Sequence, residues 1–234
     1  MKLKNEVVLI TGANRGLGLA FAREALARGA KKVYAAARNP ESVTLPGVVP
    51  VKLDVTRAED AVALAKLAGD VTVVVNNAGI ATMGAFLTEG SVEASRRHFE
   101  TNFIGVLQVS QAFAPVLAKN GGGALLNVLS VASFVNSPPL STYAASKAAT
   151  WSLTNGLRTE LAGQKTQVLG LHVGFVDTDL VRDVTAPKSD PAVVVARAFD
   201  GLEAGKSEVF ADDFSLAVKQ GLSSERAPYL GSHR

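Results

Sequence analysis

The sequence predicts an α/β protein in which helices cover both faces of a parallel sheet. Short β-branched runs alternate with longer segments rich in Ala and Leu, which is the pattern of repeated β-α-β units. The run Val71-Thr72-Val73-Val74-Val75 is nearly all apolar, as expected for a strand covered on both faces. With 234 residues, 47% of them hydrophobic and 19% charged, residues 1–234 are expected to form a single domain.

The expected strands and helices follow this alternation in order. The strands are predicted near 6–11, 32–37, 49–53, 71–76, 124–130, 167–173 and 207–210. The helices are predicted between them, at about 16–28, 57–68, 92–118, 142–162 and 191–204.

Local signals mark some helix ends. Thr56, followed three residues later by Glu59, predicts a capping box at the start of the second helix. Asp190 before Pro191 predicts an N-cap with proline at the first helical position. Pro115 is expected to kink or end the helix that contains it.

Composition argues against several classes of function. The 24 Lys and Arg exceed the 21 Asp and Glu by only three and are scattered, so a nucleic-acid partner is not expected. There is no cysteine, and His98, His172 and His233 lack the spacing of a zinc site, so no metal is expected. No apolar run approaches the ~20 residues of a membrane helix. We therefore expect a cytoplasmic protein that does not associate with membranes.

A glycine-rich turn connects the first predicted strand to the first helix. The residues from Thr11 to Gly18 place Gly12, Gly16 and Gly18 where the backbone must turn tightly. The start of a helix offers free N–H groups and a positive dipole end to phosphates. The spacing G-x-x-x-G-x-G differs from the common G-x-G-x-x-G, and a purely structural turn is the alternative.

A phenol and an ammonium group are expected on one helix face. Tyr143 and Lys147 are four residues apart. A nearby positive charge favours the phenolate, which lowers a tyrosine pKa from about 10 towards the range useful to a general acid or base. An ordinary surface pair is the alternative.

These features belong to a series of motifs with which residues 5–180 resemble the short-chain dehydrogenase/reductase family, in its compact single-domain form. In order, the motifs are the Thr11–Gly18 turn, Asp54-Val55, Asn76-Asn77-Ala78-Gly79, Asn102 in Thr101-Asn102-Phe103, Ser130 thirteen residues before Tyr143, Lys147, and Gly174 with Thr178. The resemblance implies a three-layer α/β/α Rossmann fold with a doubly wound parallel sheet of about seven strands.

The resemblance also implies roles for single residues. Tyr143 would protonate the carbonyl oxygen of the substrate, and Ser130 would hydrogen-bond that oxygen. Lys147 would lower the Tyr143 pKa and bind the nicotinamide ribose, and Asn102 would hold a water through which Lys147 exchanges protons. The implied cofactor-binding residues are Gly12, Asn14, Arg15, Gly16, Leu17, Gly18, Arg38, Asp54, Val55, Asn76, Ala78, Gly79, Tyr143, Lys147, Gly174, Val176 and Thr178.

The end of the second strand indicates the cofactor. Members that prefer NAD usually have an acidic residue here for the ribose 2′-OH, whereas Ala37 and Arg38 leave no carboxylate. Arg38 and Arg15 could pair with a 2′-phosphate, so NADP (NADPH/NADP⁺) is the expected cofactor. The alternative for Arg38 is a solvated loop residue. For Asp54 it is a turn residue, and Asn77 is as readily structural as cofactor-contacting.

The substrate side departs from the family pattern. Val173 stands where proline is usual, which frees one φ and adds an N–H near the nicotinamide carboxamide. Residues 175–205 are expected on the substrate side, and only about eleven residues separate Thr178 from Asp190. Substrate contacts are expected from Ser130, Val131, Ser137, Pro138, Leu140, Tyr143, Phe175 and Val176, a mainly apolar set.

The leading hypothesis is therefore an NADPH-dependent oxidoreductase of hydrophobic carbonyls or secondary alcohols, without a metal. An NADP(H)-binding sensor or scaffold with little turnover is the alternative. A Rossmann-like methyltransferase is less favoured, because its nucleotide lacks the pyrophosphate for which the turn is suited. The family usually forms dimers or tetramers, so a homodimer or homotetramer is expected through helices 92–118 and 142–162. Ala144, Ala145, Ala148 and Ala149 would permit close approach of these helices, and packing of the same alanines on the sheet is the alternative.

Overall fold

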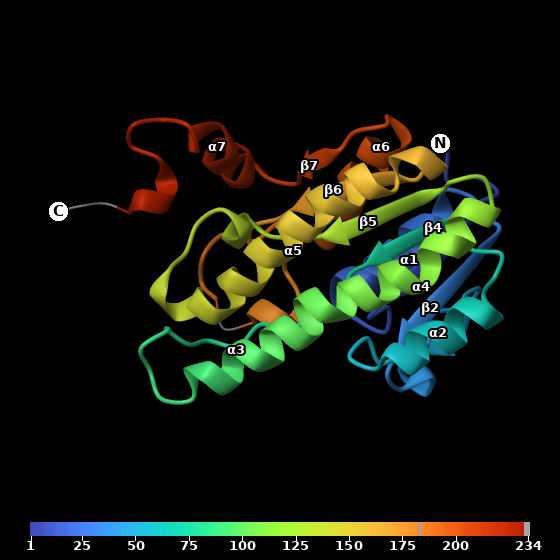
Figure 1. Ribbon diagram of the computed structural model, residues 1–234, viewed down its shortest axis with the longest axis horizontal. Helices are drawn as coiled ribbons and strands as arrows, with labels where there is room; N and C mark the ends of the chain where they lie inside the picture. The colour runs from blue at the N-terminus through green and yellow to red at the C-terminus, as the bar shows by residue number, and fades with distance from the viewer. Residues whose placement is uncertain (183, 232–234) are drawn as a thin grey trace.

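The computed structural model describes residues 1–182 and 184–231 and shows a parallel sheet between two layers of helices (Figure 1). The sheet has seven strands in the order β3-β2-β1-β4-β5-β6-β7. The predicted three-layer Rossmann fold is confirmed. The strands are β1 (Val7–Thr11), β2 (Lys32–Ala37), β3 (Val49–Lys52), β4 (Val73–Asn76), β5 (Ala124–Val128), β6 (Gln167–His172) and β7 (Glu208–Phe210).

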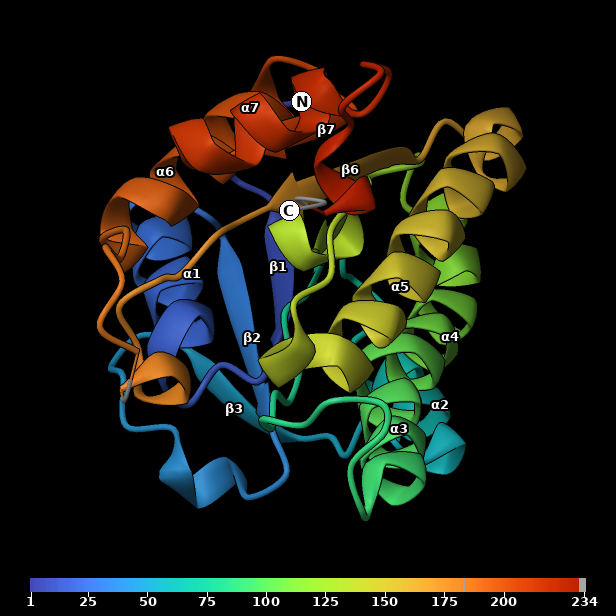
Figure 2. The same ribbon diagram turned by 90° about the vertical axis from the view of Figure 1, so that its left-hand side faces the viewer.

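Each face of the sheet has its own apolar core. Figure 2 shows the sheet between the two layers of helices. Helices α1 (Gly16–Ala27) and α6 (Pro191–Glu203) cover one face, where the rings of Phe21 and Phe199 meet edge to face at 5.2 Å. Helices α2 (Ala58–Leu67), α4 (Gly105–Lys119) and α5 (Ser141–Glu160) cover the other. Because both faces are buried, the strands read as continuous apolar runs.

The order of the strands reverses beside β1, which pairs in parallel with both β2 and β4. In sheets of this kind the loops at the carboxyl ends of the two central strands diverge and leave a crevice. Thr11 ends β1 and Asn76 ends β4, so the glycine turn and the Asn-Asn-Ala-Gly motif both open onto that crevice.

The helix expected at 92–118 is three consecutive pieces. Helix α3 (Ser91–Phe99) passes into a π-helical turn at Glu100–Ile104 and then into α4. Pro115 does not end α4, which continues to Lys119. Phe113 and Leu117, on either side of the proline, are fully buried, and their burial outweighs the loss of one backbone hydrogen bond.

One of the two predicted helix starts is confirmed. The Asp190 carboxylate accepts a hydrogen bond from the N–H of Ala192 at 2.7 Å, with Pro191 at the first helical position. The capping box at Thr56 is wrong, because the Thr56 hydroxyl donates back to the Asp54 carboxylate at 2.7 Å. Helix α2 therefore starts one residue later, after Arg57, without a side-chain cap.

Helix α7 (Asp213–Gly221) was not expected from the sequence. The Asp212 carboxylate caps it by accepting from the N–H of Ser215 at 2.8 Å. An acidic residue ahead of a short apolar periodicity was the available signal. The helix packs beside edge strand β7 and beside the turn at Val131–Ser133.

Within the described residues, Ser91–Lys119 has the length and mean hydropathy (1.2) of a membrane-spanning helix. Val109, Phe113 and Leu117 in this stretch are fully buried against the sheet. Core packing therefore accounts for these three apolar positions.

Candidate active site

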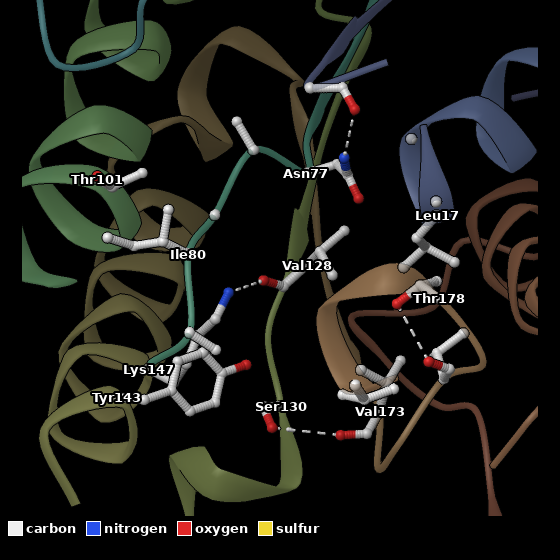
Figure 3. Close-up of a pocket in the computed structure, with 18 of the residues that line it drawn as sticks. Leu17, Asn77, Ile80, Thr101, Val128, Ser130, Tyr143, Lys147, Val173 and Thr178 are labelled. Atoms are coloured by element: carbon white, nitrogen blue, oxygen red, sulfur yellow. Dashed lines mark hydrogen bonds between the residues drawn. The ribbon is translucent and has the colours of Figure 1, made fainter. Parts of the chain in front are cut away.

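A cavity of about 360 Å³ lies at the carboxyl ends of the central strands. The glycine turn forms one side, and the ends of β5 and β6 with the start of α5 form the other (Figure 3). It brings together most of the residues that the motifs singled out, although they are spread over residues 12–178 of the chain.

Two glycines of the turn occupy positions where a side chain does not fit. Gly12 has φ +67°, and a Cβ on Gly18 would lie 2.1 Å from the carbonyl oxygen of Gly12. Helix α1 starts directly behind the turn, and no side chain caps its first N–H groups. Bare backbone and an open helix start are the features that bind phosphate, so a dinucleotide pyrophosphate fits here.

Two arginines border the cavity beside this turn. Arg15 and Arg38 line it with exposed side chains, and Asn14, Asp54 and Val55 line the same region. The Asp54 carboxylate accepts from both the N–H and the hydroxyl of Thr56, at 3.0 and 2.7 Å, so it also closes a local turn. A phosphorylated ribose would therefore meet cations at this end.

The two adjacent asparagines at the end of β4 lie in different places. Asn76, expected at the cofactor, is buried instead, and its amide donates to Asn127 at 2.9 Å and to Ser110 at 3.3 Å. Asn77 lines the cavity and donates to the carbonyl oxygen of Thr11 at 2.9 Å. Asn76 still belongs to the strand and its amide meets two buried neighbours, whereas Asn77 follows the strand and lies at the crevice. Ala78 and Gly79 also line it.

Tyr143 and Ser130 come from different elements and lie close together in the cavity wall (Figure 3). Ser130 follows β5, and Tyr143 lies in the first turn of α5. Burial raises the pKa of the Tyr143 phenol, and the Ser130 hydroxyl beside it partly offsets that rise. The pKa of Tyr143 is therefore raised, and not lowered as the spacing to Lys147 predicted. The phenol therefore holds its proton at neutral pH.

Lys147 lies one turn further along α5 and is buried. Its ammonium donates to the carbonyl oxygen of Val128 at 2.8 Å and lies 5.8 Å from the centre of the Tyr143 ring. Burial lowers the pKa of Lys147 to about 8. The lysine thus combines a charge beside the phenol with an ionisation near the physiological range.

Asn102 lies in the π-helical turn and holds the loop after β4. Its amide oxygen accepts from the N–H of Ile80 at 2.9 Å, and its amide nitrogen donates to the Ile80 carbonyl and the Ser146 hydroxyl, both at 3.0 Å. A Cβ on Gly79 would lie 3.2 Å from this amide oxygen and 3.9 Å from the Lys147 ammonium. The glycine lets the two side chains approach the same short segment.

A row of buried hydroxyls on α5 extends these contacts. Thr150 donates to the backbone carbonyl of Asn102 at 2.8 Å. Thr154, one turn on, accepts from the Asn127 amide at 3.0 Å. Ser146, Thr150 and Thr154 thus attach one face of α5 to the π-helical turn and to β5.

The known proteins that this chain matches agree with this geometry. The family model for short chain dehydrogenase matches residues 6–189. The chain belongs to this family. A crystal structure of a short chain dehydrogenase from Burkholderia cenocepacia, in complex with NADP, is 38% identical, covers 97% of this chain and 96% of that one, and superposes with a TM-score of 0.93.

Two further relatives show how widely the family matches. The 1-deoxy-11-beta-hydroxypentalenate dehydrogenase of Streptomyces exfoliatus is 33% identical over 97% of this chain and 82% of its own length. A short chain dehydrogenase/reductase from Burkholderia phymatum, in complex with NAD, is 25% identical over 94% of each chain with a TM-score of 0.83. Membership makes this protein an oxidoreductase of the nicotinamide-dependent dehydrogenase/reductase class.

The part of the cavity beyond Tyr143 and Ser130 is mainly apolar. Of the expected substrate residues, Val131, Leu140, Phe175 and Val176 line it, whereas Ser137 and Pro138 do not. Ser137 precedes a short helical turn at Pro138–Leu140, and its carbonyl accepts a hydrogen bond from the N–H of Leu140. The sequence did not indicate Ile80, Ala81, Thr101, Asp179, Val181 or Phe214, which also line the cavity. The conformation of loops and the position of α7 bring these residues to the cavity.

The backbone carbonyl of Val173, where proline is usual in the family, is engaged by two donors. Its carbonyl accepts from the N–H of Val131 at 2.8 Å and from the Ser130 hydroxyl at 3.4 Å. The next N–H, of Gly174, donates to the Asp212 carboxylate at 2.7 Å. Hydrogen bonds to the segment after β5 and to the residue that caps α7 therefore hold this segment where proline would otherwise restrict it. Gly174 and Thr178 both line the cavity.

No three His, Asp or Glu side chains within residues 1–182 and 184–231 are grouped to hold a metal ion. His233 lies outside the described residues.

Proposed function

We propose that the protein is an NADPH-dependent oxidoreductase that reduces apolar carbonyl compounds, or oxidises the corresponding secondary alcohols. The observation that carries this proposal is the shared cavity of Ser130, Tyr143 and Lys147 with the glycine turn and two arginines. It provides an acid and a phosphate-binding backbone in one enclosed space.

The roles of the chain's own groups follow from their positions. The bound nicotinamide supplies or accepts the hydride. The Tyr143 phenol, which keeps its proton at neutral pH, donates it to the carbonyl oxygen of the substrate, and Ser130 hydrogen-bonds the same oxygen. The Lys147 ammonium stabilises the phenolate that remains and binds the ribose hydroxyls. Asn102 holds the loop beside Lys147, and we assign to it the water that exchanges protons with the lysine.

The proposed preference for NADPH rests on charge. Arg38 and Arg15 line the cavity where the adenosine end of the cofactor would lie, and Ala37 offers no carboxylate to a free 2′-OH. The NADP complex of the Burkholderia cenocepacia relative supports this preference, while the NAD complex of the Burkholderia phymatum relative shows that the family uses both cofactors.

The proposed substrates are apolar because the cavity walls around the substrate space are apolar. Val131, Leu140 and Phe175 surround the space beyond the Tyr143 hydroxyl. A charged sugar phosphate would find few charge partners there. The Streptomyces relative, named for a hydroxypentalenate, fits an oxidoreductase of alcohols.

We further propose that residues 1–234 act as one cytoplasmic domain that binds both cofactor and substrate. Its substrate side lies within 175–205, and α6 packs away from the cavity against α1. The residues of this range that line the cavity are Phe175, Val176, Thr178, Asp179 and Val181. We propose a homodimer or homotetramer formed through α4 and α5, where Ala148 is exposed and Ala145 and Ala149 are half-buried.

The decisive experiment follows NADPH absorbance while a panel of aldehydes and ketones is offered to the purified protein, with Tyr143→Phe as the inactive control. Turnover by the wild type alone supports the proposal. If NADPH binds tightly but no carbonyl is reduced and no alcohol is oxidised, the protein is an NADP(H)-binding sensor or scaffold instead.

A further inference from the structure

We propose that Phe214 is a specificity-determining residue, which forms a fixed wall for an extended apolar group of the substrate. The proposal rests on the function proposed above and narrows its substrate class. It selects carbonyl compounds with an apolar chain of several carbons over small aldehydes and ketones.

Phe214 comes from a part of the chain far from the other cavity residues. Within the described residues beyond Asp190, it is the one that lines the cavity. Its side chain is 62% exposed, so most of an aromatic surface is free for contact. Aromatic side chains stabilise an apolar partner by removing a large area from water.

The start of α7 is attached to the backbone beside Ser130. One Asp212 carboxylate oxygen accepts from the N–H of Gly174 at 2.7 Å and from the hydroxyl of Ser215 at 3.0 Å. The other accepts from the N–H of Ser215 at 2.8 Å. Ser215 itself is fully buried, so the residue that follows Phe214 is fixed.

The second half of α7 is attached to the sheet edge. The Lys219 ammonium pairs with the Glu208 carboxylate at 3.3 Å. It also lies 4.9 Å from the centre of the Trp151 ring and 5.1 Å from that of Phe134. With both halves of α7 held, the backbone at Phe214 is in place before substrate arrives, so binding has only its side chain to order.

The connection between β6 and α6 is short, and the part of the cavity wall where Phe214 lies is supplied by α7. The base of this connection is closed by hydrogen bonds from Ser189 N–H to the Phe175 carbonyl at 2.8 Å and from Asp177 N–H to the Ser189 carbonyl at 2.9 Å. Only eleven residues, 179–189, separate Thr178 from Asp190. A connection this short supplies Val181 and Asp179 to the cavity and leaves Phe214 to provide the remaining wall.

The test compares a short and a long straight-chain aldehyde, propanal and octanal, in the wild type and in Phe214→Ala. We expect the variant to lose about tenfold in kcat/KM for octanal, because the chain loses an apolar wall, and to stay within twofold for propanal. Phe214→Leu should recover part of the loss. Leu216→Ala, which removes a partly exposed residue of α7 outside the cavity lining, is the matched control and should change neither.

A second measurement separates this inference from the proposed reaction. Octanamide, which is not reduced, is titrated by calorimetry into the wild type and Phe214→Ala, each saturated with NADPH. We expect about tenfold weaker binding to the variant. Equal affinities, no binding to the wild type, or equal losses for both aldehydes would overturn the role of Phe214. Absence of aldehyde turnover with the expected octanamide result would overturn the reaction alone.

Discussion

The imidazole of His98 packs edge to face against the phenol ring of Tyr143, with ring centres 6.1 Å apart. His98 is fully buried, and its Nε2 accepts from the N–H of Thr82 at 3.0 Å. Together with Asn102, one turn away, it holds the backbone of residues 80–82. His98 therefore couples the cavity wall at Ile80 to the ring of the acid.

Replacing this contact should affect turnover more than cofactor binding. In His98→Phe the ring remains but the acceptor for Thr82 is lost, at a cost of ~1 kcal/mol in stability. We expect a fall of about threefold to tenfold in kcat, with NADPH affinity unchanged by fluorescence titration. His98→Gln, which keeps an acceptor, should retain more activity than His98→Phe. The reverse order would show that the hydrogen bond to Thr82 is not what matters.

His98 also predicts acid sensitivity. Burial, and secondarily the charge of Arg97, lower the pKa of His98 below its usual range. A depressed pKa means that the folded state prefers neutral His98, so its stabilisation is complete above pH ~6.5 and is lost as pH falls below that value. Urea unfolding at pH 7.5 and 5.5 should show a larger loss for the wild type than for His98→Gln.

Tyr143→Phe should remove most turnover while leaving NADPH affinity within a few-fold. The ring and its packing persist, but the transferable proton is gone, and general acid catalysis contributes ~10²–10⁴-fold in rate. Steady-state kinetics on a verified substrate and fluorescence titration of NADPH measure the two effects separately. A variant with near wild-type kcat would reject Tyr143 as the acid.

Lys147 predicts stability that rises with pH. Its pKa falls to about 8 in the folded protein, while the unfolded chain keeps the ordinary value of 10.5. Between these values the unfolded state binds more protons, so the wild type should gain stability relative to Lys147→Met, on the order of 3 kcal/mol in total. Denaturant unfolding of both proteins from pH 7.5 to 10 tests this. A constant difference would show that Lys147 is not desolvated.

Arg38→Ala should weaken NADPH binding by about tenfold or more and leave the affinity for NADH nearly unchanged. A charge-assisted hydrogen bond contributes roughly 1.5–3 kcal/mol, and only NADPH carries a 2′-phosphate on the adenosine ribose. Lys52→Ala is the control, because Lys52 is an exposed cation on the neighbouring strand outside the cavity. Equal losses for both cofactors, or wild-type affinity that is tighter for NADH, would contradict recognition of the 2′-phosphate.

Ala148→Glu should weaken the proposed oligomer, since a charge would be placed on the exposed side of α5. Light scattering at micromolar concentration measures the mass. Val193 is an exposed residue of α6, in the opposite helical layer, so Val193→Glu should leave the mass unchanged. A monomeric wild type would contradict the oligomer itself.

What could be predicted from the sequence depended on how local the signal was. The strands were predictable because two-sided burial leaves continuous apolar runs, and Asp190 because an N-cap involves neighbouring residues. The placement of Asn76 and Asn77 on opposite sides depended on where β4 ends. Phe214 and the contact of His98 with Tyr143 depend on tertiary packing, for which single residues carry no signal.

The buried hydroxyls of α5 have a consequence for how the proposed catalytic residues are oriented. An apolar helix face packs almost equally well after a small rotation about its axis, but Ser146, Thr150 and Thr154 each meet a particular partner. Turning α5 would break these hydrogen bonds together and leave several polar groups buried without partners. The hydrogen bonds therefore fix the rotation of α5 about its axis, and in that orientation Tyr143 and Lys147 both face the cavity.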